Sequence, residues 1–166
     1  MIAALFASIA VASSPALGTA EGRCRERETG PAILVEALGL KDRQGLLRLE
    51  LYPARDGDFL TDDNILIAAG KTFARVDLPV PHAGSARLCI RVPHAGAYAL
   101  SLLHDRNANL KFDPSSDGIG FTGNPKLGWS KPGARQATVI AGPGLTHAEI
   151  RLNYLHGLAM RPEAVE

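Results

Sequence analysis

The feature that most constrains the fold of this chain is the alternation of apolar and polar side chains in short segments. In residues 45–52, Leu47, Leu49 and Leu51 alternate with Arg48 and Glu50. A period of two places the leucines on one face of a β-strand and the charged side chains on the other. This alternation, or an apolar β-compatible composition, predicts strands at residues 32–40, 45–52, 72–80, 86–92, 97–104, 136–141 and 147–155.

Turn sequences rich in glycine and proline (KDRQG, PHAGS, PHAG and AGPG) separate most of these segments. About seven short strands joined in this way are typical of an antiparallel, Ig-like β-sandwich. The sequence therefore predicts an all-β protein with a single sandwich domain over residues 21–166. Residues 61–70 are equally compatible with a short helix capped by Thr61 and with a loop followed by a strand.

The chain has 166 residues, a length that fits one domain with a buried core. Its net charge is +1, from 18 basic and 17 acidic residues, so no general field attracts nucleic acid. Aromatic residues make up 5% of the chain, which leaves few side chains for stacking on bases. We therefore expect no nucleic-acid partner.

Residues 1–20 carry no charge and hold an apolar run over residues 2–11 that is too short to span a bilayer. Gly18, Thr19 and Ala20 offer the small side chains that precede a signal-peptidase site. We expect a signal peptide over residues 1–20, export to the periplasm or the medium, and no transmembrane segment in the mature chain. No lysine or arginine precedes the apolar run, so either the export signal is weak or the true start lies upstream. A buried N-terminal helix is the alternative to a signal peptide.

Both cysteines of the chain, Cys24 and Cys89, follow the expected leader. In an oxidising compartment, an even number of cysteines favours a disulfide bond. We expect Cys24 to pair with Cys89, and two unrelated buried thiols are the alternative.

Residues 105–134 show neither the helical nor the strand period. A loop of this length in a compact domain commonly has a function. Oxygen-bearing side chains at every second position can surround a hard cation, and a later carboxylate completes the shell. The sequence therefore predicts a weak Ca²⁺ site, the one cofactor that we expect, formed by Asp105, Asn107, Asn109, Asp113 and Asp117.

The same residues also permit an interpretation without a metal. Leu110 and Ser116 stand where an EF-hand loop has its glycine and its final glutamate. In this alternative, Asp105, Asn107 and Asn109 form Asx turns on their own backbone.

An enzymatic hypothesis rests on His104 and Asp105, which lie together at the start of the loop and offer an acid/base pair for a periplasmic hydrolase. No nucleophile elbow, P-loop or dinucleotide fingerprint accompanies them, so we expect no catalytic residue. Trp129, the single tryptophan, is expected either to stack on a sugar ring or to cover the base of its own loop.

The polar motif also resembles a family of exported bacterial proteins, domain of unknown function 2141. The family pattern is a Gly-x-Tyr-Ala strand that runs into His-Asp-x-Asn, a second Asn and an Asp, a glycine-rich segment and a Lys-Pro turn. The matching residues are Gly96, Tyr98, Ala99, His104, Asp105, Asn107, Asn109, Asp113, Gly118, Gly120, Phe121, Asn124, Lys131 and Pro132. Many members have a glycine after the second Asn, where this chain has Leu110. The resemblance extends over the mature chain and implies a transthyretin-like or Cna-B-like sandwich, but no specific activity.

These features favour a non-catalytic binding or structural module of the bacterial cell envelope. We expect its working surface to be the loop at residues 105–134. The partner is expected to be another envelope protein or a small ligand.

Overall fold

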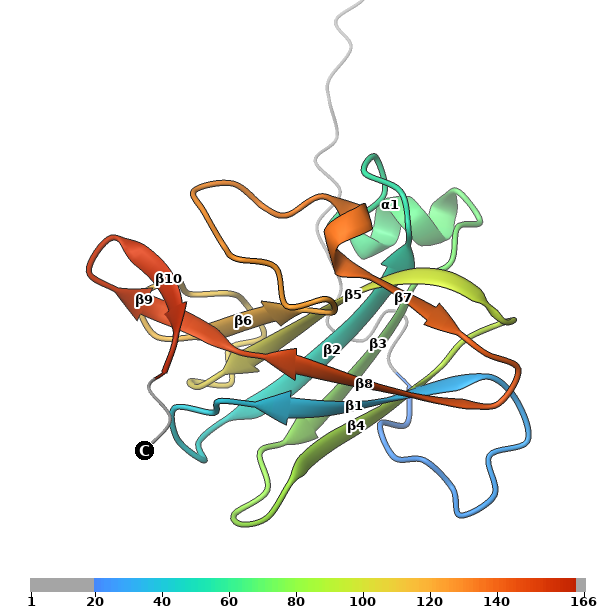
Figure 1. Ribbon diagram of the computed structural model, residues 1–166, viewed down its shortest axis with the longest axis horizontal. Helices are drawn as coiled ribbons and strands as arrows, with labels where there is room; N and C mark the ends of the chain where they lie inside the picture. The colour runs from blue at the N-terminus through green and yellow to red at the C-terminus, as the bar shows by residue number, and fades with distance from the viewer. Residues whose placement is uncertain (1–19, 164–166) are drawn as a thin grey trace, which may run out of the picture.

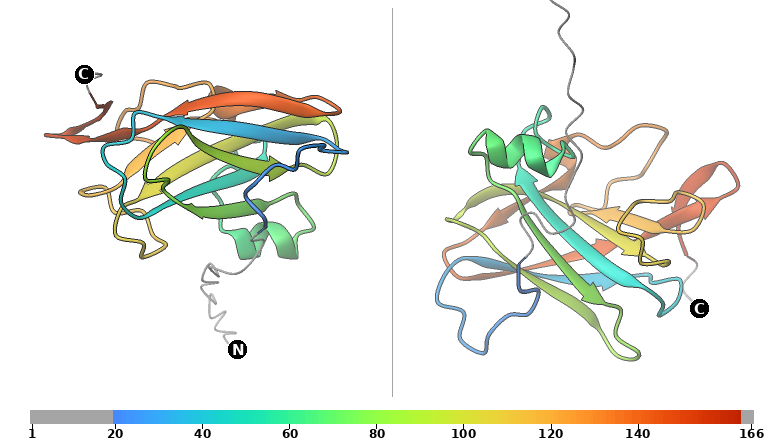
Figure 2. Two further views of the ribbon diagram at one scale, coloured as in Figure 1. Left: turned by 90° about the horizontal axis from the view of Figure 1, so that it is seen from below. Right: turned by 180° about the vertical axis from the view of Figure 1, so that it is seen from behind.

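The computed structural model describes residues 20–163. These residues form two β-sheets that pack face to face, and a short helix lies on the outer side of the larger sheet (Figures 1 and 2). The expected signal peptide, residues 1–20, lies outside the described residues apart from Ala20. No helix within residues 20–163 has the length and apolar character needed to cross a membrane.

The smaller sheet has three strands in the order β4-β1-β8. Its strands are β1 (Ala32–Leu38), β4 (Ala86–Arg91) and β8 (Leu145–Arg151). β1 pairs antiparallel with β4 and parallel with β8. The parallel pair departs from the purely antiparallel sandwich that the sequence predicts. It arises because β1 and β8 are joined through the other sheet rather than by a hairpin.

The larger sheet has the strand order β10-β9-β6-β5-β2-β3. Strand β7 pairs with the first half of β5, and β6 pairs with the second half. The bounds are β2 (Leu46–Pro53), β3 (Ala74–Pro79), β5 (Gly96–Asp105), β6 (Gly118–Phe121), β7 (Thr138–Ala141), β9 (Asn153–His156) and β10 (Ala159–Pro162).

The predicted all-β class and sandwich architecture are confirmed, but two boundaries differ. The stretch expected as one loop at residues 105–134 contains β6 and ends in the short 3-10 helix η1 (Ala134–Ala137). Strand β6 has the sequence GIGF, and its two glycines hide the strand pattern. The strand expected at residues 147–155 is divided into β8 and β9, because the chain leaves the smaller sheet at Leu152 and joins the larger one.

Residues 61–70, for which helix and strand were both open, form helix α1 (Asp63–Ala68). The N-cap is Asp62 and not Thr61, whose hydroxyl donates to the Gly57 carbonyl at 3.2 Å. A buried ion-pair network fixes this helix on the larger sheet. Arg75 lies 2.8 Å from the Asp63 carboxylate and 2.7 Å from that of Glu50.

The main core lies between the two sheets. Leu47, Leu49 and Leu51, which defined the alternation, are at most 1% exposed there. A second apolar cluster covers the outer face of the larger sheet beneath α1 and η1, and consists of Tyr52, Phe59, Leu66, Ala99, Phe121, Ala134 and Ala137. Strand β5 therefore contacts apolar side chains on both faces, which explains its nearly continuous apolar sequence.

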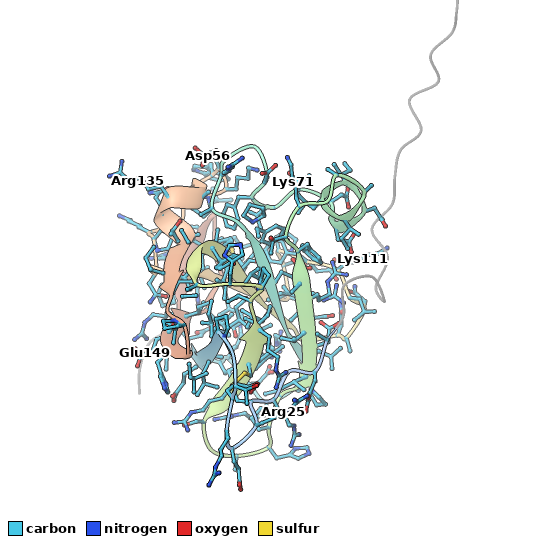
Figure 3. The ribbon with its side chains drawn as sticks, turned by 90° about the vertical axis from the view of Figure 1, so that its right-hand side faces the viewer. Arg25, Asp56, Lys71, Lys111, Arg135 and Glu149 are labelled. Carbon is cyan, nitrogen blue, oxygen red and sulfur yellow. A yellow bond between two sulfur atoms is a disulfide. The ribbon has the colours of Figure 1, made fainter. Side chains whose placement is uncertain are left out.

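The predicted disulfide between Cys24 and Cys89 is present, with the two Cα atoms 5.1 Å apart. It ties the segment before β1 to β4, and the sulfur atoms are visible in Figure 3. Because 65 residues separate the two cysteines, the bond closes a long loop of the unfolded chain.

Reduction of this bond is expected to lower the free energy of unfolding by about 4 kcal/mol, the loop-closure entropy of a crosslink of this length. Urea unfolding with and without dithiothreitol measures the difference. The Cys24→Ala variant, which lacks the bond under both conditions, is expected to match the reduced wild type. Equal stability of the oxidised and reduced wild type contradicts the prediction.

Candidate functional site

His104 lies near the end of β5, with its side chain buried in the core between the sheets. Its Nε2 atom is 2.8 Å from the Gln44 carbonyl oxygen, and its Nδ1 atom is 2.6 Å from the Tyr154 hydroxyl. Because a carbonyl only accepts, Nε2 carries the proton and Nδ1 accepts from the hydroxyl. The Tyr154 oxygen in turn accepts the Lys41 backbone N–H at 3.0 Å. Both ring nitrogens therefore serve to hold the structure together.

Burial lowers the pKa of His104 below its usual value. The hydrogen bond to the Gln44 carbonyl and the charge of Asp42, 3.8 Å away, act in the opposite direction but do not reverse the shift. The imidazole is consequently neutral at neutral pH, as its hydrogen bonds require.

Asp105 follows His104 but points to the opposite face of the strand, as successive strand residues do. Its carboxylate is 1% exposed and accepts the backbone N–H groups of Asn109 at 3.2 Å and Leu110 at 2.7 Å. The two side chains are therefore buried on different sides of the sheet. This geometry does not support the hydrolase hypothesis, because an acid/base pair must reach one substrate from one side.

Asp117 closes the loop at residues 106–117 from its other end. Its carboxylate is fully buried and accepts the backbone N–H groups of Arg106 at 3.0 Å and Asp113 at 2.9 Å. The Ser116 hydroxyl also donates to it, at 3.1 Å. Two buried carboxylates, Asp105 and Asp117, thus replace regular secondary structure as partners for the backbone of this loop.

The remaining predicted ligands, Asn107, Asn109 and Asp113, lie at the solvent-exposed part of the loop. The side-chain amides of Asn107 and Asn109 both donate to the Asp113 carboxylate, at 2.9 and 2.7 Å. These two hydrogen bonds lower the pKa of Asp113. The amide oxygens accept the backbone N–H groups two residues further on, which is the Asx-turn arrangement.

The structure thus brings the five predicted calcium ligands into one loop, where their oxygens accept N–H groups. Among residues 20–163, the loop's three carboxylates do not form a close group of three acidic, histidine or cysteine ligands. The group that does, Cys24, Glu28 and Cys89, contains two sulfurs already joined in the disulfide. Calcium binding by the loop, in which Asn107 and Asn109 would also be ligands, stays a prediction.

A solvent-accessible groove lies where the segment after β6 meets the β9–β10 hairpin. We call it the basic groove. It has a volume of about 500 Å³ and is lined by Asn124, Pro125, Lys126, Leu127, Arg151, Asn153, Ala159, Met160, Arg161 and Pro162. It therefore joins the second half of the loop expected at residues 105–134 to the C-terminal strands.

One wall of the basic groove is fastened to β8 by Asn124. The Asn124 side chain donates to the Glu149 carbonyl at 3.2 Å and accepts the Arg151 backbone N–H at 2.7 Å. Strand β6 approaches the same region closely because Gly120 has no side chain. A Cβ atom there lies only 2.5 Å from the Arg151 carbonyl oxygen. The hydrogen bonds of Asn124 and the close approach of β6 therefore fix this side of the groove to β8.

The groove carries positive charge from Lys126, Arg151 and Arg161, and none of its lining residues is acidic. Within the described part of the chain, these three side chains form no ion pair; Arg161 donates a hydrogen bond to the His156 carbonyl at 3.3 Å. The carboxylate of Glu163, which follows the hairpin, lies 3.5 Å from both Lys41 and His156.

Two large apolar side chains on the segments that form the groove face the solvent. Trp129 is 88% exposed and Leu158 is 79% exposed, the highest values among the large apolar side chains of residues 20–163. Trp129 is too exposed to cover the base of its own loop, and Leu127 of the same loop packs against the outer apolar cluster. The loop at residues 122–133 and the β9–β10 hairpin project from the same side of the molecule (Figures 1 and 2).

The hairpin side of the groove, with Met160 and Arg161, was not predicted from the sequence, nor was the contribution of Arg151 from β8. These residues are distant in sequence from the loop at residues 105–134. A local signal was available: Gly157 has a positive φ of 66° in the hairpin turn, and a Gly-x pair between short strands indicates such a turn.

Fold and site together define an all-β protein with two packed sheets and an exposed basic groove at one end. The chain belongs to a bacterial family described as an uncharacterized protein conserved in bacteria (DUF2141), whose model matches residues 35–148. The match includes the loop side of the groove and ends before β9 and β10. No curated protein and no solved structure matches the chain.

Replacement of Asp105 by alanine is expected to lower the free energy of unfolding by about 2–3 kcal/mol. The reason is the loss of two hydrogen bonds from backbone N–H groups to a buried carboxylate. Asn107→Ala, which alters an exposed side chain of the same loop, is the control and is expected to cost less than about 1 kcal/mol. Urea unfolding compares them, and equal losses refute a special role for Asp105.

The same two variants test the calcium hypothesis in thermal melts with EDTA or with added CaCl₂. Calcium that binds only the folded protein raises the melting temperature by mass action, and Asp105→Ala removes that rise. If calcium leaves the melting temperature of the wild type unchanged, the calcium hypothesis is wrong and the motif only stabilises its loop by hydrogen bonds.

Stability is expected to fall as the pH drops below about 6.5, the value for histidine in an unfolded chain. Since the pKa of His104 is lower in the folded protein, the unfolded chain takes up the proton first and gains stability from it. The slope for this one group is at most about 1.4 kcal/mol per pH unit. Urea unfolding of wild type and His104→Gln between neutral and mildly acidic pH measures the effect, and identical pH profiles argue against it.

Proposed function

We propose that this protein is an exported, non-catalytic binding module of the bacterial cell envelope. Its binding surface is the face formed by the loop at residues 122–133 and the β9–β10 hairpin. The observation that carries the proposal is the basic groove, whose cations form no ion pair within residues 20–163 and whose two flanking segments carry the exposed Trp129 and Leu158. Exposed apolar groups of this kind are typical of interaction sites.

Export is supported by two features of the chain. The uncharged apolar segment at residues 2–11 is followed by small side chains that suit signal-peptidase cleavage. The disulfide between Cys24 and Cys89 is of the kind that persists outside the reducing cytosol.

Binding is favoured over catalysis by the way the polar side chains are used. His104, Asp105 and Asp117 are at most 1% exposed, and each is hydrogen-bonded to the protein itself. A catalytic acid or base must instead reach the substrate. The exposed surface near the groove offers charge and apolar contact, which are the means of recognition rather than of bond cleavage.

Site-specific photo-crosslinking in the native bacterium tests the proposal. A photoreactive amino acid is placed at Leu158 of the full-length protein, and the adducts from the envelope fraction are identified by mass spectrometry. The matched control is Ile140, an apolar side chain of β7 that is 68% exposed and does not line the groove. We expect one dominant adduct from Leu158 and none from Ile140.

Two results contradict the proposal. The first is the absence of an adduct at Leu158 in protein recovered from the envelope. The second is an equal yield of the same adducts from both positions, which shows contact without a preferred face.

A further inference from the structure

We propose that the partner of this face is an anionic phospholipid surface, to which the protein attaches peripherally. The inference rests on the proposed function, because it names the occupant of the same face. It is drawn from the combination of charge, exposed apolar side chains and their arrangement around the basic groove.

The charge around the groove is suited to lipid phosphates. Lys126, Arg151 and Arg161 come from three separate segments, and no acidic side chain lies among the lining residues. Each basic side chain close to an anionic membrane strengthens binding about fivefold, and the effect falls off within a Debye length. The net charge of the whole chain is only +1, so attraction to the membrane depends on where these cations are placed.

The two most exposed large apolar side chains lie on the segments that form the groove. Trp129 belongs to the loop at residues 122–133, and Leu158 lies at the turn of the β9–β10 hairpin. Tryptophan concentrates at the level of lipid headgroups, where its ring is in an apolar environment while its N–H contacts water. Leu158 lies in the two-residue turn outside the paired positions of the hairpin, where its exposed side chain is free to enter the same layer.

Basic and apolar side chains at one surface also assist each other. The stems of lysine and arginine are apolar, so Lys126 and Arg161 can reach phosphates while their methylene groups lie beside Met160 and Leu127, which line the same groove. This combination is the one found on proteins that bind the membrane interface without crossing it.

The structure favours a lipid surface over an acidic polypeptide. An extended peptide gains most of its affinity by adding a strand to a free sheet edge. At the groove, the edge strand of the larger sheet is β10. It has four residues and ends in Pro162, a residue without a backbone N–H. A peptide paired there also leaves Trp129 and Leu158 in water, because they lie on the loop and the hairpin turn.

Trp129 provides a site-specific probe, because it is the single tryptophan of the chain. The protein purified from the envelope is mixed with vesicles of phosphatidylglycerol and phosphatidylcholine in equal amounts, or of phosphatidylcholine alone. We expect sedimentation with the anionic vesicles and a blue shift of the Trp129 fluorescence. We also expect at least a tenfold weaker effect with neutral vesicles, and release at about 0.5 M NaCl.

Variants separate the charged from the apolar contribution. A double variant, Lys126→Gln with Arg161→Gln, is expected to bind anionic vesicles about 25-fold more weakly. The charge-matched control is Arg23→Gln with Arg27→Gln, for which we expect no change in binding.

For the apolar contribution, Leu158→Ser is expected to weaken binding about tenfold or more, which is the transfer of one leucine side chain from water. Ile140→Ser is the matched control and should bind as the wild type does.

Three results overturn the lipid proposal: no sedimentation with anionic vesicles, an unshifted Trp129 emission in their presence, or equal losses in the test and control variants. If a polyglutamate peptide shifts the Trp129 emission while the vesicles do not, the partner is an acidic polypeptide. In that case the lipid inference fails, and the crosslink from Leu158 still supports the binding face. Failure of the Leu158 crosslink together with failure of the vesicle assay removes both proposals.

Discussion

Strand β5 is buried on both faces, and the two sheets, the outer apolar cluster and the loop at residues 106–117 all depend on it. Alternate side chains of the strand enter the core between the sheets and the cluster beneath α1 and η1. At its end the alternation continues with polar groups: His104 enters the main core and Asp105 turns to the other side. Because both are buried, each must find hydrogen-bond partners within the protein.

These two residues fix different parts of the molecule. His104 accepts a hydrogen bond from the Tyr154 hydroxyl, so it holds β9, the first strand of the hairpin that forms one side of the basic groove. Gly118 permits this approach, since a Cβ atom at that position would collide with the Tyr154 ring. Asp105 instead organises the loop that leads to β6. The position of the groove therefore follows from hydrogen bonds made in the interior.

The parts of the fold that could be predicted from the sequence are the strands whose pattern lies within their own residues. The leucines of β2 and the apolar length of β5 carry their strand pattern in their own residues, and the cysteine pairing followed from compartment and count. Strand β6 was missed because its pairing depends on contacts with β5 and β9, and its glycines serve close approach rather than strand propensity. For the same reason the groove was not foreseen, since it joins Lys126 to Arg161, which are 35 positions apart in the sequence.

The polar motif at residues 105–117 and the basic groove have opposite effects on the stability of the folded protein. Asp105, Asn107 and Asn109 stabilise the fold because their polar atoms are satisfied internally. Lys126, Arg151 and Arg161 line one groove, where their like charges repel one another, although Glu163 lines an adjoining hollow with Arg151 and offsets part of this cost. The exposure of Trp129 adds a further cost, because its apolar surface stays in water. An anionic, partly apolar partner would lower both costs, and for this reason we propose the groove, rather than the polar motif, as the place of binding.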